Sequence, residues 1–168
     1  SMTAKPLTLS VSPVSRQYDG TRNISLATTT AADLIGVEPG DILTVDHSQL
    51  SATVASAAVG TNKALTVVVG ATYLSGLDLA NYQLPTIAGS PVVDITRANQ
   101  ATLTITSLTS TTYGQDLTLS STGGTGTGAT TYAVDSGPCT VSGTTLSPTA
   151  AGTCAITATK AQDSTYLA

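Results

Sequence analysis

The chain carries one pattern twice, and this repeat limits the folds that it can adopt. Each copy is a short alternating strand, a turn anchored by a tyrosine, and a second alternating strand. The first copy runs through residues 7–10, 18–20 and 23–26, and the second through residues 103–106, 113–115 and 116–119. Diverged copies in tandem predict two small modules, residues 3–97 and 98–168, instead of one large domain. Arrays of such modules usually space or bind other molecules and do not catalyse reactions.

The composition favours thin β-sheets. The chain has no Trp and no Phe, six Tyr, and 33 Thr among its 168 residues. Thr and Val favour strands because their branched side chains fit a pleated surface and lose rotamer freedom in helices. A core of Leu, Ile, Val and Ala suits two sheets packed face to face, about 10 Å apart. We therefore expect an all-β chain of two tandem immunoglobulin-like β-sandwich modules.

Charge and hydropathy argue against two classes of partner, nucleic acids and membranes. Only 10% of the residues are charged, the net charge is −4, and the six Lys and Arg residues are scattered. Such a chain cannot neutralise several phosphates at once, so we expect no nucleic-acid partner. No apolar run approaches the roughly 18 residues that a membrane span needs, so no membrane insertion is expected. Low charge with abundant Thr and Ser is typical of exported surface proteins.

Alternation of apolar and polar residues predicts most of the strands. In the first module these are residues 7–12, 24–26, 42–45, 50–54, 64–69 and 92–96. Alternating positions in the second module are Leu103/Ile105, Leu117/Leu119, Tyr132/Val134, Cys139/Val141, Leu146 and Cys154/Ile156/Ala158. Turns are expected at residues 18–21, where Asp19 can bond the backbone two residues on, and at residues 60–63. Residues 29–34 could form one helical turn.

Three blocks of the first module carry a family resemblance. They are Arg-Gln-Tyr-Asp-Gly-Thr at residues 16–21, Gly-Thr-Asn-Lys at 60–63, and Leu-Ser-Gly-Leu-Asp-Leu-Ala-Asn-Tyr at 74–82. In this order they resemble the YDG domain, a β module of long bacterial surface and secreted proteins, including filamentous-haemagglutinin-like adhesins. Residues 98–168 resemble a bacterial immunoglobulin-like repeat, through the glycine-rich residues 123–128, the two cysteines, and residues 160–166.

This resemblance implies a stalk or spacer segment of an adhesin, outside the cell or on the bacterial surface. The implied partners are neighbouring repeats of the same parent protein and a host-surface or glycan receptor. No catalytic residue and no cofactor is carried over, so we expect no enzyme. The alternative is a ligand-binding module such as a carbohydrate-binding β-sandwich. Such modules commonly present exposed aromatic rings to sugars, and the absence of Trp weakens this alternative.

Two motifs match catalytic or cofactor-binding patterns in residue type, but not in the structural context that the chemistry needs. Asp46, His47 and Ser48 are the residue types of a hydrolase triad, but neighbours in a strand point to opposite faces and cannot pass a proton along one line. We expect His47 at the surface. Residues 124–129 fit the G-x-G-x-x-A phosphate motif, which needs a helix after it. The Thr-rich sequence that follows predicts a strand, so a hairpin is the better interpretation.

Bound calcium or an isopeptide bond could stiffen the modules. The carboxylates are spread singly, without the ligand spacing of a calcium loop, so no metal site is assigned. Calcium at the joint between the modules, through Asp94 and Asp116, stays an alternative. Lys5 could form an isopeptide bond with an Asn or Asp, but a linker lysine lying along the apolar surface fits its position better.

The two cysteines predict a disulfide between Cys139 and Cys154. Cys139 shares a strand face with Val141 and Cys154 shares one with Ile156, so both thiols should point into the core. A pair of cysteines in one module of about 70 residues with few large core residues suits an exported domain. The alternative is two buried free thiols.

Four tyrosines, Tyr18, Tyr82, Tyr113 and Tyr166, each lie beside a predicted turn. Without Phe or Trp these rings are the largest apolar groups available, so we expect them to pack inward with the hydroxyl reaching backbone or water.

The end of the second module is expected to lack a strand. In the first module about ten residues and then a strand at residues 92–96 follow Tyr82, whereas the sequence stops two residues after Tyr166. Ser1-Met2 resembles a cloning remnant, which suggests a fragment of a longer protein. A missing last strand would leave an open sheet edge, through which the chain would associate with a second copy or accept a neighbouring strand.

Overall fold

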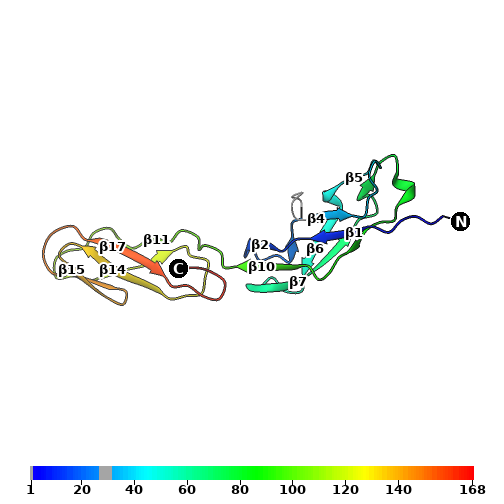
Figure 1. Cartoon of the computed structure of the whole chain (residues 1–168). Coiled ribbons are helices and arrows are strands. Elements are labelled where there is room, and N and C mark those ends of the chain that lie inside the picture. The colour runs from blue at the N-terminus through cyan, green and yellow to red at the C-terminus, as the bar shows by residue number, and fades with distance from the viewer. Residues whose placement is uncertain (1, 27–31) are drawn as a thin grey trace. The chain divides into compact units, whose positions relative to one another are not determined.

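A computed structural model of the chain describes residues 2–26 and 32–168. The chain divides into two compact units, Ser1–Thr96 and Arg97–Ala168, which are described separately (Figure 1). The described residues are nearly all in strands and loops, and they include two single-turn 3₁₀ helices, η1 (His47–Gln49) and η2 (Leu79–Asn81). The expected all-β class is confirmed.

Within its described residues, unit 1 has two sheets and one short two-stranded ladder. One sheet has the order β4 (Ala32–Ile35), β1 (Thr8–Val11), β9 (Thr86–Ile87), with β1 antiparallel to β4 and parallel to β9. The other has the order β2 (Val14–Gln17), β10 (Val92–Thr96), β7 (Gly60–Val69), β6 (Leu50–Val54), β3 (Asn23–Ile24). In it β2 and β10 are parallel and the other pairs are antiparallel. A short ladder joins β5 (Thr44–Val45) to β8 (Leu74–Ser75).

Alternating side chains from these strands build the core of unit 1. Leu7, just before β1, and Leu9, within it, enter the core. Val93 and Ile95 enter it from β10. Because strand neighbours point to opposite faces, Thr8 and Asp94 between them are turned away from the centre of this core. Tyr73, just before β8, is 0% exposed and is the largest fully buried side chain. The first-strand and β10 alternation expected from the sequence is confirmed.

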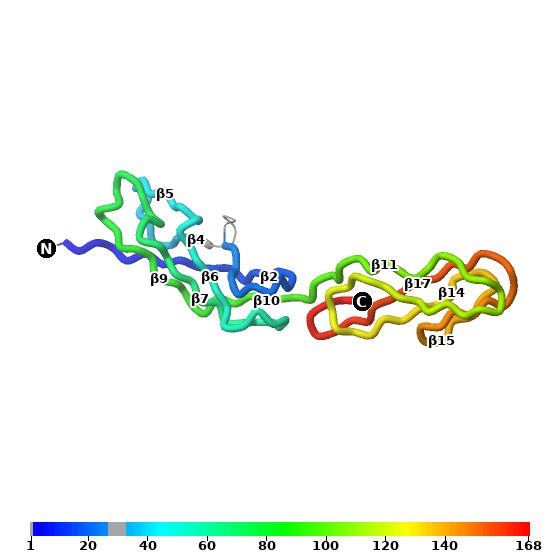
Figure 2. Tube along the Cα trace, turned by 180° about the vertical axis from the view of Figure 1, so that it is seen from behind, coloured from blue at the N-terminus to red at the C-terminus, as the bar shows by residue number. Residues whose placement is uncertain are grey.

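Two local predictions for unit 1 were wrong. Ala32–Ile35 is strand β4 instead of part of a helical turn, because its residues pair with β1, and residues 29–31 lie outside the described residues. Residues 60–63 belong to β7 instead of a turn, because they pair with β10. The turn-like sequence there forms a bulge: Asn62 has φ +49°, and its N–H bonds Asp94 Oδ1 at 2.7 Å where the register shifts. Figure 2 shows β7 beside β10 from behind.

Unit 2 is built from three small antiparallel sheets. These are β11 (Thr104–Ile105) with β13 (Ser121–Thr122), β12 (Leu117–Thr118) with β16 (Thr145–Pro148) and β15 (Cys139–Ser142), and β14 (Thr130–Ser136) with β17 (Ala155–Lys160). Its buried cluster consists of Leu119, Cys139 and Leu146, with partly buried residues packed around them. The predicted Cys139–Cys154 disulfide is present, with its Cα atoms 6.3 Å apart. This core is much thinner than that of unit 1.

The two units share one backbone arrangement near their first residues. Lys5 pairs in parallel with Tyr82, and Ala98 pairs in parallel with Tyr166. In unit 1 the Lys5 N–H donates to Asn81 O at 2.7 Å, and the Gln83 N–H donates to Lys5 O at 2.9 Å. In unit 2 the same two bonds join Ala98 to the residues on either side of Tyr166, at 3.0 and 2.9 Å. The entering segment of each unit is thus bonded to the segment around its late tyrosine.

Candidate functional site

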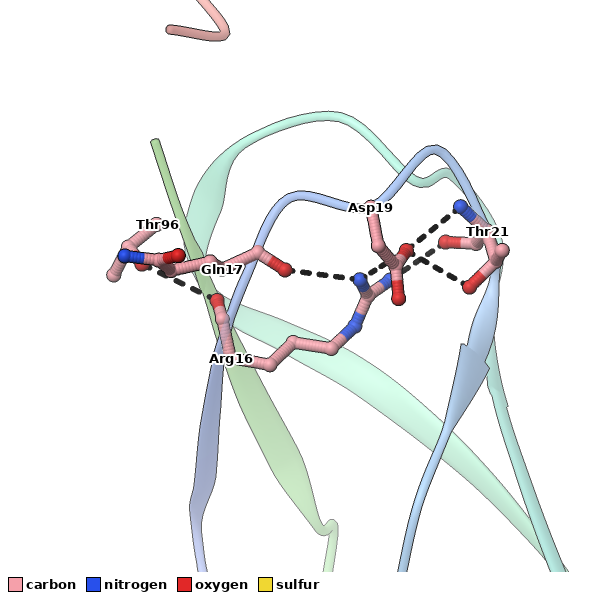
Figure 3. Close-up of polar contacts among 5 residues, drawn as sticks. All are labelled: Arg16, Gln17, Asp19, Thr21 and Thr96. Atoms are coloured by element: carbon pink, nitrogen blue, oxygen red, sulfur yellow. Dashed lines mark hydrogen bonds and ion pairs between the residues drawn. The ribbon is translucent and has the colours of Figure 1, made fainter. Parts of the chain in front are cut away.

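The turn after β2 carries the sequence block that most resembles a known family. Figure 3 shows the Arg16 guanidinium lying between Gln17 and Thr21, beside Asp19. Its Nη1 donates to Gln17 O at 3.1 Å, and its Nη2 donates to Thr21 O at 2.6 Å. The same guanidinium forms an ion pair with Asp19. Arg16 therefore closes the turn from β2 to the residues before β3.

Asp19 braces the same turn from inside. Its Oδ1 accepts hydrogen bonds from both the N–H and the hydroxyl of Thr21, each at 2.8 Å (Figure 3). These bonds, together with Arg16, hold the pKa of the Asp19 carboxyl below its usual value. Gly20 has φ +79°, a conformation that glycine adopts without a steric penalty. The predicted bond from Asp19 to the backbone two residues on is confirmed.

The end of β10 fastens this turn to the sheet. The Thr96 hydroxyl donates to Arg16 O at 3.3 Å, and the Tyr18 N–H donates to Thr96 O at 2.9 Å. The Tyr18 ring is half-buried and packs against the core of unit 1. The two terminal nitrogens of Arg16 and the Asp19 carboxylate are bonded within the turn, which makes it a bracing element.

A second polar cluster surrounds Tyr82. The ring is buried, its hydroxyl donates to Asp41 Oδ2 at 2.5 Å, and it accepts from the Glu38 N–H at 2.9 Å. The hydrogen bond with Asp41 raises the pKa of Tyr82. Lys5 forms an ion pair with Glu38, which occupies its ammonium group. The inward packing predicted for Tyr82 is confirmed.

Tyr113 is the tyrosine for which the prediction was wrong. Tyr113 is 66% exposed, and no described strand pairs with residues 107–113. Tyr166, by contrast, is half-buried beside its backbone bridge to Ala98.

The residues of the triad-like motif do not form a relay. Asp46 Oδ1 accepts from the Ser48 N–H at 3.0 Å and the Ser48 hydroxyl at 2.6 Å, so the carboxylate caps η1 and bonds the serine directly. These bonds also lower the pKa of Asp46. His47 is half-buried instead of lying at the surface, since its ring lies in a T-shaped arrangement with that of Tyr73, with centroids 6.0 Å apart. Its Nδ1 has no hydrogen-bond partner among the described residues.

The carboxylates considered for calcium have local partners. Asp94 Oδ1 accepts from the Asn62 N–H, and Asp116 Oδ1 accepts from the Ser147 hydroxyl at 2.6 Å. Within residues 2–26 and 32–168 no group of three or more His, Cys, Asp or Glu side chains is placed to hold a metal ion. Over the same residues, no helix has the length and apolar character needed to cross a membrane.

Asp163 is the polar centre of unit 2, and sequence reasoning gave it no role. One carboxylate oxygen accepts from the N–H groups of Thr165 and Tyr166 at 2.8 and 2.7 Å. The other accepts from the N–H and hydroxyl of Thr127 at 2.7 and 3.1 Å. It thereby ties the glycine-rich loop before β14 to the Tyr166 turn. That loop runs into strand β14, so it lacks the helix that a phosphate motif needs.

Acid should weaken unit 2 through Asp163. Its pKa is lowered to about 2, first by the Thr127 N–H and then by those of Thr165 and Tyr166. A lowered folded-state pKa means that the stabilisation is complete above about pH 4 and is lost as the pH falls through about 2. We expect the melting temperature of unit 2 to fall over this interval, and Asp163→Asn to lower it at neutral pH and flatten the acid profile.

Thr127→Val is the matched control for this prediction. It keeps the backbone N–H and removes only the longer hydroxyl bond, so its effect on melting should be smaller. Residue-resolved NMR melting at several pH values separates the two units. An Asp163→Asn variant that keeps the steep acid profile would contradict this role.

Comparison with known protein families identifies the first unit. No curated protein and no solved structure matches the chain significantly. The family model described as the YDG domain matches residues 3–89, which is 87 of the 168 residues and more than half of the chain. The match contains the Arg16–Asp19–Thr21 turn and the Tyr82 cluster. The chain therefore belongs to the YDG domain family.

Proposed function

We propose that the chain is a non-catalytic spacer segment of a bacterial cell-surface or secreted adhesin, built from two tandem immunoglobulin-like β-sandwich modules. The observation that carries this proposal is the backbone closure found in both units, Lys5 with Tyr82 and Ala98 with Tyr166. Two units closed in the same way are what an array of related modules would contain. Each unit adds length to such an array, and its partners are neighbouring repeats of the same parent protein.

Further features support an extracellular spacer. Membership of the YDG family fits a module of long surface proteins. The Cys139–Cys154 disulfide fits an oxidising compartment, where small domains with thin cores commonly use such a bond. The conspicuous polar groups of unit 1, at the Arg16 turn and around Tyr82, are bonded within the unit and are suited to bracing it.

The proposal can be tested by replacement in the displayed parent protein. Removing the segment should reduce the adhesion of the bacteria, because the adhesive end would be held closer to the cell. An unrelated pair of β-sandwich modules of similar length should restore adhesion, whereas a flexible Gly/Ser linker of the same residue number should restore less. Adhesion that returns only with this sequence would mean that the segment itself contacts a receptor.

One observation favours the alternative of a carbohydrate-binding module. The exposed Tyr113 ring is an aromatic surface of the kind that sugar rings stack against. A glycan array probed with the whole chain and with Tyr113→Ala separates the two functions. The spacer predicts no signal from either protein, and a glycan class lost on Tyr113→Ala would establish the carbohydrate function instead.

A further inference from the structure

The two cysteines of the unit 2 disulfide lie in different surroundings. Cys139 lies within β15, is 8% exposed, and belongs to the buried cluster with Leu119 and Leu146. Cys154 lies just before β17 and is only partly buried at the border of this cluster. The Cys154 side of the disulfide is therefore the more open of the two.

An open groove of unit 2 leads to Cys154. It has a volume of about 610 Å³, within the range of about 300–1,000 Å³ found for binding clefts. Residues 105–113 contribute to its lining on one side, and residues 150–156 on the other. Among the described residues, Cys154 lines this groove and Cys139 does not. A molecule that enters the groove thus meets the disulfide at Cys154.

The segments around the groove leave room for such a molecule. Residues 150–152 are Ala-Ala-Gly and are exposed, so little side chain stands in front of Cys154. Residues 108–113 are exposed as well, and no described strand pairs with them. A molecule can therefore approach Cys154 without displacing a strand.

The backbone holds the two cysteines unequally. Cys139 pairs with Pro148 of β16, and its N–H donates to Gly137 O at 3.0 Å. Cys154 belongs to no described strand. If the disulfide opens, Cys139 should keep its place in β15, while Cys154 has more freedom to turn into the groove.

These features matter for one reaction, thiol–disulfide exchange. A thiolate attacks one sulfur of a disulfide, and access is one of the factors that decide which sulfur is attacked. None of the described lining residues of the groove carries a charge, so no side chain there attracts or repels a thiolate. Access should therefore decide the choice between the two sulfurs.

We propose that Cys154 is the site at which unit 2 exchanges its disulfide with an external thiol. The external thiolate forms a new S–S bond with Cys154 Sγ, the bond to Cys139 Sγ breaks, and Cys139 leaves as a thiolate that takes a proton from water. In the reverse direction the Cys139 thiolate attacks Cys154 Sγ of the mixed disulfide and releases the external thiol. This site goes beyond the spacer role and does not depend on it, because it uses only the disulfide and the groove.

The external thiol can be a small molecule or the reactive cysteine of an oxidoreductase, so the test has two arms. The whole folded chain is treated at mildly alkaline pH with glutathione, or with a Cys-X-X-Cys oxidoreductase whose second cysteine is replaced by serine. The reaction is quenched in acid, and free thiols are alkylated after unfolding. Chymotrypsin cleavage after Leu146 separates the two cysteines for mass spectrometry.

We expect roughly tenfold more adduct on Cys154 than on Cys139 in the folded chain. The same reaction in urea above the unfolding midpoint should give similar amounts on both, because the fold no longer shields Cys139. An adduct on Cys154 in either arm supports the exchange site, and the arm that gives it identifies the source of the thiol.

A pair of charge variants tests the route of attack. Thr109→Glu places a negative charge in the groove, so the rate of thiolate attack should fall roughly threefold at low salt and recover at high salt. Thr140→Glu places the same charge beside Cys139 in β15, outside the groove, and the rate should be unchanged. Both threonines are exposed, so both variants should fold.

Four results would overturn the proposal. They are no adduct in either arm, equal or greater adduct on Cys139 in the folded chain, the same preference for Cys154 in urea, and a rate that Thr140→Glu lowers as much as Thr109→Glu does.

Discussion

Replacing Tyr73 by alanine should lower the free energy of unfolding of unit 1 by about 3–5 kcal/mol, the range for removing a large aromatic side chain from a core. The ring is 0% exposed, and it belongs to the same cluster as Leu9 and Val93. The chain contains no Phe or Trp that could fill the space. Urea unfolding followed by the NMR signals of unit 1 measures the loss. The exposed variant Leu77→Ala should change it little.

Tyr73→Phe tests the same site in the opposite direction. The Tyr73 hydroxyl is buried without a hydrogen-bond partner among the described residues, and this burial raises its pKa. Phenylalanine keeps the ring and removes a desolvated hydroxyl, so stability should be unchanged or higher by about 1 kcal/mol. A loss as large as that of the alanine variant would show that the hydroxyl has a partner in solution.

Reducing the Cys139–Cys154 disulfide should cost unit 2 about 3 kcal/mol, the value of the chain-entropy model for a closed loop of about 15 residues. Few other contacts can compensate, since the buried cluster of unit 2 is limited to Leu119, Leu146 and one of the bonded cysteines. We expect unit 2 of the reduced protein to unfold at a much lower temperature than unit 1.

The control lies within the same chain. Unit 1 contains no cysteine, so its melting should not respond to reductant. The double variant Cys139→Ser, Cys154→Ser should reproduce the reduced melting curve. Free thiols detected in the unfolded, unreduced protein would contradict the disulfide.

The sequence predicted the parts of the fold that depend on local pattern. The strands at residues 50–54 and 92–96 have the predicted limits, because each alternates and is bounded by polar or turn residues. The hydrogen bond between Asp19 and Thr21 joins residues only two positions apart, so the local sequence was enough to predict it. The disulfide followed from the strand faces that the two cysteines share with Val141 and Ile156.

The features that the sequence did not predict depend on contacts between residues far apart in the chain. Residues 60–63 carry a turn sequence, yet pairing with β10, about 30 residues later, holds them in a bulged strand. Asp163 meets Thr127 across 36 residues, so no local signal marked it as a centre of hydrogen bonds. The burial of Tyr73 and the exposure of Tyr113 could not be predicted from local sequence either, because they depend on which distant strands pack against each ring.

The parallel pairing in unit 1 determines how that unit would bear tension. Strand β2 lies near its beginning and β10 at its end, and four residue pairs join them in the same direction. Pulling the two ends apart would draw these strands along each other, so their hydrogen bonds would be loaded together in shear instead of opening one after another. The parallel pairing of β1 with β9 adds two further residue pairs with the same loading direction. Since forced unfolding depends on the unfolding rate, this geometry should make unit 1 resist stretching more than its free energy of unfolding alone would suggest.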